Sequence, residues 1–193
     1  MKHNLVKRAF KKVDRKLFAP KQYTGLAYSD TPIPLDSDSS IRQPSLVVEM
    51  IELLELTGKE HVLEIGTASG YSAAILSYCC KTVETIEINR SLAEKAKKRL
   101  QALGYKNITV HPGDGAFGLP AKAPFDAIVV TAAVEQIPSA LIEQLKNDGR
   151  IVVPVGGINI SDMQQLVVGL KKGDKLITKS VNVVKFVPLV RGE

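Results

Sequence analysis

The amino-acid sequence predicts an α/β fold with a mostly parallel, doubly wound sheet, an antiparallel edge and an N-terminal helical arm. From residue 61 onward, short apolar segments alternate with helix-like ones, as in a parallel sheet that helices cover on both faces. A glycine-containing turn, "GTASG", follows the first apolar segment. Two strand-like segments around "KKGD" near the end of the chain predict a hairpin at the sheet edge.

Length and composition predict one domain over residues 1–193. Hydrophobic residues make up 45% of the chain and charged residues 24%, which is typical of a soluble globular protein. No apolar run approaches the roughly 20 residues of a membrane span, and the basic start lacks the apolar block of a secretory signal. We therefore expect a cytoplasmic protein. Its expected parts are an N-terminal helix, arm and first core helix (1–60), a ligand-binding core (61–160) and C-terminal strands (161–193).

The basic charge is confined to the N-terminus. The first 16 residues contain seven Lys/Arg and one Asp, which accounts for the whole net charge of +6. Val6, Phe10, Val13 and Leu17 form one stripe of a helix there, with the lysines on its other faces. A solvated helix face explains these lysines better than an RNA-binding patch, because no aromatic residues are interleaved with them. A nucleic-acid partner is therefore not expected.

The remaining elements follow from local patterns. Residues 18–44 are rich in Pro, Ser, Asp and Gly without a period, which indicates an ordered arm. Helical periodicity predicts a helix over 45–56, and Gly104 predicts a helix end. The expected strands are 61–65, 82–88, 107–111, 125–131 and 150–156; the expected helices between them are 71–80, 90–104 and 137–149; the expected hairpin is 163–190.

Neither cysteines nor histidines indicate a metal site. Cys79 and Cys80 are adjacent and have no metal-ligand spacing, and His3, His61 and His111 are scattered along the chain. We expect small apolar fillers at the two cysteines, structural roles for His61 and His111, and no metal.

The glycine turn predicts a ligand site beyond the first strand of the sheet. A dinucleotide is disfavoured, because "GTASGY" lacks the last glycine of the G-x-G-x-x-G fingerprint. Glu64, two residues before Gly66, would also repel a pyrophosphate. A positively charged ligand would be attracted instead. S-adenosylmethionine carries an ammonium and a sulfonium group and no phosphate.

Two more acids support a nucleoside. Glu87 ends the second strand, 21 residues after Gly66, where a carboxylate can accept hydrogen bonds from both ribose hydroxyls. Asp114, between Gly113 and Gly115, is expected to contact the adenine amino group. Glu64, Glu87 and Asp114 thus follow three successive strands, and together they predict a site for adenosine with a cationic tail.

The sequence resembles the protein-L-isoaspartate O-methyltransferases over nearly its whole length. The resemblance rests on "VDRKLFAP", "LAYSDTPIPL", "VLEIGTASGY", "PGDGAFGLPAKAPFDAIVVTAA", "IPSALIEQLKNDGRIVVPVG" and "VKFVPLVRGE". It implies a Rossmann-like class I methyltransferase that transfers a methyl group from S-adenosylmethionine to the α-carboxylate of L-isoaspartyl residues in damaged proteins, leaving S-adenosylhomocysteine. The ester then collapses to a succinimide that hydrolyses partly to aspartate, which makes the reaction a repair step. A monomer is expected.

The expected reaction needs no catalytic base. A carboxylate with a pKa of about 4 is already ionised at neutral pH and can attack the methyl group directly. The enzyme has to supply alignment and a dry pocket. The lack of a Ser/His/Asp or Cys/His set therefore fits this chemistry.

The sequence departs from the family at "DSSIRQP", where the family usually has "GQTISQP". Arg42 occupies the position of the serine regarded as catalytic, and Ser40 that of the threonine. Arginine can hold a carboxylate with two parallel hydrogen bonds, but a cation beside the sulfonium would weaken donor binding unless Asp38 or a substrate acid offsets it. Ala68 also replaces a usual glycine, which is tolerable at a negative φ.

Several functions therefore stay open. The chain is an isoaspartyl methyltransferase, a relative that methylates another carboxylate or works weakly on isoaspartate, or a non-catalytic cofactor-binding protein that grips an acidic peptide through Arg42. A nicotinamide oxidoreductase and an RNA methyltransferase are less favoured. The segment after the fourth strand, "TAAVEQIP", has neither the acid–Pro–Pro–aromatic motif nor the cysteine common in RNA base methylases.

Specific roles follow from the motifs and the resemblance. Ser40 and Arg42 are the catalytic candidates. The expected cofactor-binding residues are Ser39, Ile41, Glu64, Gly66, Thr67, Ser69, Gly70, Glu87, Ile88, Asp114 and Gly115. The expected substrate-binding residues are Thr131, Ala132 and Lys185.

Overall fold

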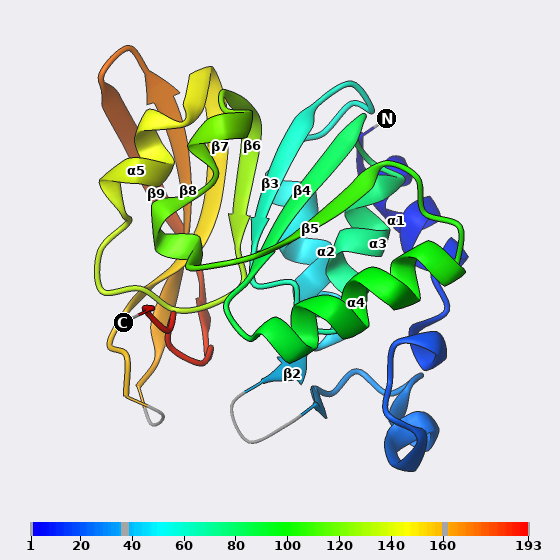
Figure 1. The fold of residues 1–193 in the computed structure, drawn as a ribbon. Coiled ribbons are helices and arrows are strands. Elements are labelled where there is room, and N and C mark those ends of the chain that lie inside the picture. The colour runs from blue at the N-terminus through cyan, green and yellow to red at the C-terminus, as the bar shows by residue number, and fades with distance from the viewer. Residues whose placement is uncertain (1, 36–38, 160–161, 193) are drawn as a thin grey trace.

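The computed structural model contains a seven-stranded sheet with the strand order β5-β4-β3-β6-β7-β8-β9 (Figure 1). It describes residues 2–35, 39–159 and 162–192, with residues 2–4 as backbone only. The neighbouring strands β5, β4, β3, β6 and β7 pair in parallel. Strands β8 and β9 form the antiparallel edge, which confirms the predicted fold class. The strands are β3 (His61–Ile65), β4 (Thr82–Glu87), β5 (Ile108–Pro112), β6 (Phe125–Val130), β7 (Leu145–Gly156), β8 (Gln164–Lys172) and β9 (Lys175–Val184).

Helices cover both faces of this sheet because its strands are apolar on both sides. Val62 belongs to the core that contains residues of α1 to α4, and its neighbour Leu63 belongs to the core that contains Leu141 of α5. Successive strand residues point to opposite faces, so a run such as "HVLEI" buries side chains in both layers. The helices are α1 (Lys2–Lys12), α2 (Pro44–Leu53), α3 (Tyr71–Ser77), α4 (Arg90–Ala102) and α5 (Ser139–Glu143), with 3-10 turns η1 (Arg15–Leu17), η2 (Lys21–Leu26), η3 (Gly115–Phe117) and η4 (Pro120–Lys122).

Two expectations about local structure were wrong. The helix predicted over 137–149 ends at Glu143, and residues 145–149 already belong to β7. The Lys171 ammonium group donates hydrogen bonds to the carbonyl groups of Ile142 and Leu145 at 2.8 Å, which satisfies the helix end. In addition, α1 ends at Lys12, so Leu17 lies outside the helix and is 52% exposed, whereas Val6 and Val13 are buried as expected.

No helix within the described parts of the chain is long and apolar enough to cross a membrane.

The N-terminal arm is held in place by one buried guanidinium group. Arg15, only 3% exposed, donates hydrogen bonds to the backbone carbonyl groups of Ser29 (3.0 Å), Thr31 (2.7 Å) and Arg42 (3.0 Å). Burial lowers the pKa of Arg15, and the Asp30 carboxylate partly opposes this effect. The contacts join the start of the arm to the short strand pair β1 (Ile33–Pro34) and β2 (Ser40–Ile41). Arg15 therefore fixes the segment that reaches Arg42.

We predict that Arg15→Leu lowers the free energy of unfolding by about 2–4 kcal/mol, because several carbonyl groups lose a charged donor. Urea denaturation measures this change, and limited proteolysis should show faster cleavage within residues 18–44. The exposed Lys16 provides the control, since Lys16→Ala should change stability by less than about 0.5 kcal/mol. Equal effects of the two substitutions would contradict the assigned role of Arg15.

Candidate active site

A cavity lies at the carboxyl ends of β3, β4 and β6, where the chain order of the sheet reverses between β3 and β6. Ligands bind at such switch points in open α/β sheets. The segment with β2 and the C-terminal segment both approach this end of the sheet (Figure 1). The lining residues are Ser39, Ser40, Ile41, Arg42, Val47, Ile65, Gly66, Thr67, Ala68, Ser69, Tyr71, Ser72, Ile86, Glu87, Ile88, Gly115, Thr131, Ala132 and Val187–Val190.

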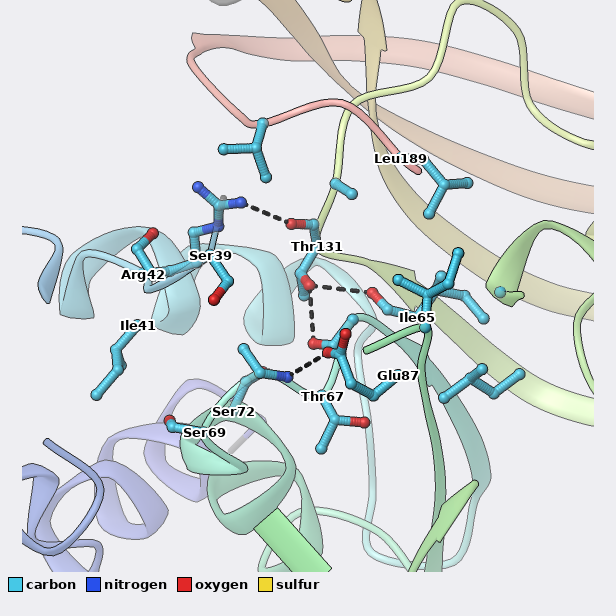
Figure 2. Close-up of a pocket in the computed structure, with 18 of the residues that line it drawn as sticks. Ser39, Ile41, Arg42, Ile65, Thr67, Ser69, Ser72, Glu87, Thr131 and Leu189 are labelled. Atoms are coloured by element: carbon cyan, nitrogen blue, oxygen red, sulfur yellow. Dashed lines mark hydrogen bonds between the residues drawn. The ribbon is translucent and has the colours of Figure 1, made fainter. Parts of the chain in front are cut away.

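Thr131 fixes the glycine turn that forms one wall of the cavity (Figure 2). Its hydroxyl group lies 3.0 Å from both the Ile65 and the Gly66 carbonyl oxygens. Gly66 has φ +99°, and a Cβ atom there would come within 2.3 Å of the Thr131 hydroxyl oxygen. Only glycine fits this close approach. Thr131, expected to line the substrate groove, thus lines the cavity and also positions its turn.

Ala68 does not have the negative φ at which an alanine was expected to be tolerated in the glycine turn. Ala68 has φ +48°, in the left-handed region that disfavours a side chain. Its N–H group donates a 2.8 Å hydrogen bond to the Glu87 carboxylate, so the turn conformation is tied to β4.

Glu87 presents its carboxylate to the cavity in a fixed orientation. One oxygen accepts from Ala68 N–H, and the other accepts from Asn89 N–H at 3.0 Å. Each carboxylate oxygen can accept about two hydrogen bonds, so each retains capacity for one more. Glu87 thus keeps acceptor capacity on both oxygens for a pair of neighbouring hydroxyl groups, and its ribose role stays a prediction.

Glu64 lies beneath the cavity and does not line it. Its side chain is fully buried, and one carboxylate oxygen accepts a 2.7 Å hydrogen bond from Thr85, while the other has no partner among the described residues. Burial raises the pKa of Glu64 to about 7, against the opposing effects of hydrogen bonds from Thr85 and Ser72, and the Glu87 charge raises it further. The sequence predicted direct contact between Glu64 and a ligand, but Glu64 does not reach the cavity; its neighbour Ser72 does line it.

Asp114 also lies outside the cavity wall. Its carboxylate accepts hydrogen bonds from Ala116 N–H at 2.8 Å and Gly192 N–H at 2.9 Å. It thereby fixes the turn after β5 and the C-terminal segment, whereas the sequence predicted an adenine contact. Gly115 does line the cavity, and a Cβ atom there would come within 2.2 Å of an Ile65 methyl group. Of the three acids predicted from the sequence, only Glu87 reaches the cavity.

The arm brings Ser39, Ser40, Ile41 and Arg42 to the cavity, as expected. The Arg42 guanidinium group donates a 3.2 Å hydrogen bond to the Thr131 carbonyl oxygen (Figure 2). It also lies 4.6 Å from the centre of the Phe186 ring. Burial lowers the pKa of Arg42 to about 10, so the group remains a cation at neutral pH. Asp38, expected to offset this charge, lies outside the described residues.

The other expected site residues divide into three groups. Thr67, Ser69, Ile88 and Ala132 line the cavity. Gly70 instead is the N-cap of α3 with φ +87°, and a Cβ atom there would come within 3.1 Å of the Leu100 side chain. Lys185 lies in a neighbouring groove that also contains Arg42.

One wall of the cavity, Val187–Val190, was not predicted from the sequence. This segment pairs with Ala133 after β6, through hydrogen bonds of 2.8 Å from Ala133 N–H to the Val187 carbonyl oxygen and from Leu189 N–H to the Ala133 carbonyl oxygen. The motif "FVPLV" was a signal for it, although nothing in the local pattern places a C-terminal segment beside the loop after β6.

The lining chemistry fits a nucleoside with an uncharged or cationic tail. Ile65, Ile86, Ile88 and Leu189 supply apolar walls, and Glu87 supplies acceptors for a diol. Among the described lining residues Arg42 is the one cation, and no lysine is available for a pyrophosphate. S-adenosylmethionine therefore fits these residues better than a dinucleotide. No cluster of three His, Cys, Asp or Glu residues that could hold a metal occurs in the described parts of the chain.

We predict that stability without ligand falls as pH rises from about 4.5 to 7, because native Glu64 keeps its proton while the unfolded carboxyl loses it. The contribution of Glu64 is on the order of 3 kcal/mol at most. Urea denaturation at pH 5 and pH 8 should show this fall in the natural chain and a smaller one in Glu64→Gln. An identical pH dependence in both proteins would contradict the raised pKa.

Comparison with known proteins places these features in a family. The family model described as protein-L-isoaspartate (D-aspartate) O-methyltransferase matches residues 1–193. A protein-L-isoaspartate O-methyltransferase 2 of Shewanella sediminis is 48% identical over 189 residues, covering 98% of this chain and 77% of that protein. A protein-L-isoaspartate O-methyltransferase of Roseiflexus sp. (strain RS-1) is 46% identical, covering 95% and 83%.

Solved structures give the same result. One protein-L-isoaspartate O-methyltransferase superposes with a TM-score of 0.87 at 31% identity and covers 96% of this chain, which spans 61% of that longer chain. A Plasmodium falciparum structure in complex with S-adenosyl-L-homocysteine, at a TM-score of 0.80 and 20% identity, shares the fold. The chain therefore belongs to the protein-L-isoaspartate (D-aspartate) O-methyltransferase family.

Proposed function

We propose that this chain transfers a methyl group from S-adenosylmethionine to the α-carboxylate of L-isoaspartyl residues in damaged proteins, the first step of their repair to aspartate. The observation that carries the proposal is the switch-point cavity, which combines apolar walls, the aimed Glu87 carboxylate and the glycine turn in a member of this family. The relatives that carry this activity in their names match nearly the whole chain.

The cavity supports a reaction that needs no proton transfer. When bound, the donor supplies a methyl group on a sulfonium sulfur, which keeps the electron pair of the broken bond. The substrate carboxylate is already ionised at neutral pH and forms the new C–O bond. We assign Glu87 to hold the ribose, the turn from Gly66 to Ser69 to hold the methionyl part, and Ile65 and Leu189 to exclude water. These contacts align the reactants, which is the main contribution the protein has to make.

We also propose that the protein works as a monomer in the cytoplasm. Both cysteines, Cys79 and Cys80, are buried free thiols, as is usual in a reducing compartment.

We predict that the protein methylates a peptide with one L-isoaspartyl residue and leaves the peptide with normal aspartate at that position unmodified. The assay measures methanol released by mild base from the methyl ester after incubation with S-adenosylmethionine. A normal-aspartyl peptide of the same sequence is the matched control. Methanol at background level with both peptides would contradict the proposed function.

We predict that Glu87→Gln weakens binding of S-adenosylhomocysteine about tenfold to a hundredfold, because an acceptor for the ribose diol is lost and an amide faces a backbone N–H group. Isothermal titration calorimetry measures the affinity. Glu94→Gln, on the exposed face of α4, removes the same charge away from the cavity and should leave the affinity unchanged. Unchanged affinity in Glu87→Gln would exclude the ribose role.

A further inference from the structure

Arg42 is a rigidly held cation at the edge of the active-site cavity. Its backbone carbonyl accepts a 3.0 Å hydrogen bond from Arg15, so the main chain is fixed. Its guanidinium group is fixed by the Thr131 carbonyl oxygen at 3.2 Å and by the face of the Phe186 ring. An arginine held at both ends is oriented before any ligand arrives, which lowers the entropic cost of binding.

The charge of Arg42 has no acidic partner in residues 2–35, 39–159 and 162–192. None of the ion pairs in these ranges includes Arg42, and its one side-chain hydrogen bond leads to a neutral carbonyl group. Burial alone lowers its pKa, and no neighbouring carboxylate raises it again. A guanidinium group has five N–H donors, and removing it from water is costly unless an anion compensates. The arrangement therefore suits an anion that a ligand brings.

Arg42 also connects the cavity to a second groove, which we call the α2–β9 groove. It is lined by Pro32, Arg42, Gln43, Ser45, Leu46, Glu49, Met163, Asn182, Val183, Val184 and Lys185. Glu49, the acid of this groove, accepts hydrogen bonds from the Asn182 amide at 3.1 Å. Arg42 is the one charged residue that lines both the cavity and the groove among the described residues. Arg42 therefore lies where the cavity and the α2–β9 groove adjoin.

We infer that Arg42 is the receptor for the substrate carboxylate and selects the isoaspartyl residue in its anionic form. This inference rests on the proposed function and adds a residue role to it. Methylation converts the carboxylate to a neutral ester, so the ion pair with Arg42 exists before the reaction and is lost after it. Arg42 therefore favours the substrate over the product and promotes release of the methyl ester.

The inference predicts an effect on KM larger than the effect on kcat. An interaction with the ground-state anion lowers KM, and it does not accelerate a step in which that charge disappears. Arg42→Gln should raise KM for an L-isoaspartyl peptide about tenfold to a hundredfold, as expected for a lost charge-assisted hydrogen bond, with kcat unchanged or raised. Arg42→Lys, which keeps the charge without the bidentate geometry, should recover part of the affinity.

The experiment combines steady-state kinetics with two binding measurements. An isoasparaginyl peptide, whose neutral amide replaces the carboxylate, should inhibit the natural enzyme weakly, and Arg42→Gln should bind this peptide and the isoaspartyl peptide about equally. Calorimetry with S-adenosylhomocysteine should give the same affinity for the natural chain and Arg42→Gln, which also shows that the cavity is folded. Lys179→Gln removes an exposed charge from β9 and serves as the control.

Three results would overturn the inference. An unchanged KM in Arg42→Gln would exclude Arg42 from substrate binding. A loss of S-adenosylhomocysteine affinity in Arg42→Gln would assign the guanidinium group to the donor carboxylate. The same rise in KM in Asp38→Asn would assign the counter-ion to the chain itself. The natural chain distinguishes failure of this inference from failure of the proposed function. If it binds S-adenosylhomocysteine and methylates the isoaspartyl peptide, the proposed function stands even where the role of Arg42 is overturned. If it does neither, the proposed function and the role of Arg42 both fail.

Discussion

The hydrogen bonds of Thr131 hold the functional end of the molecule together. Its hydroxyl group binds the Ile65 and Gly66 carbonyl oxygens, and its own carbonyl oxygen accepts from Arg42. The first contact requires a glycine at position 66, where a Cβ atom would come within 2.3 Å of the hydroxyl oxygen. The contact from Arg42 to the Thr131 carbonyl oxygen requires the arm to reach the end of β6. Arg15 holds the arm there by donating a hydrogen bond to the Arg42 carbonyl oxygen. The glycine turn, the switch point and the arm are therefore one unit.

The charges around this unit match the reaction. Glu87 lines the cavity, which favours a donor with positive charge, while Arg42 lies at the edge of the cavity, where its charge favours an anionic substrate. Methyl transfer from a sulfonium to a carboxylate removes one charge of each sign. A dry, apolar cavity favours such a reaction, because charged reactants lose more solvation there than neutral products do. Alignment and exclusion of water can thus replace a catalytic base.

The strand and helix pattern was largely predictable, because apolar runs and glycine turns depend on neighbouring residues. The end of the helix between β6 and β7 was less predictable, because Lys171, far along the chain, helps to end α5 at Glu143. Glu87 was placed correctly because a strand end defines its position. Glu64 and Asp114 were placed at the right end of the sheet, but the direction of a side chain depends on partners such as Thr85 and Gly192. The Val187–Val190 wall depends on long-range pairing with Ala133, which no local pattern contains.

A crystal structure with S-adenosylhomocysteine and an L-isoaspartyl peptide would test the central claim most directly, namely that Glu87 and Arg42 bracket one reaction centre. We expect the ribose hydroxyls on the Glu87 carboxylate and the peptide α-carboxylate on the Arg42 guanidinium group, with one carboxylate oxygen directed at the sulfur. Adenosine bound away from β3 and β4, or a peptide carboxylate with no contact to Arg42, would contradict it.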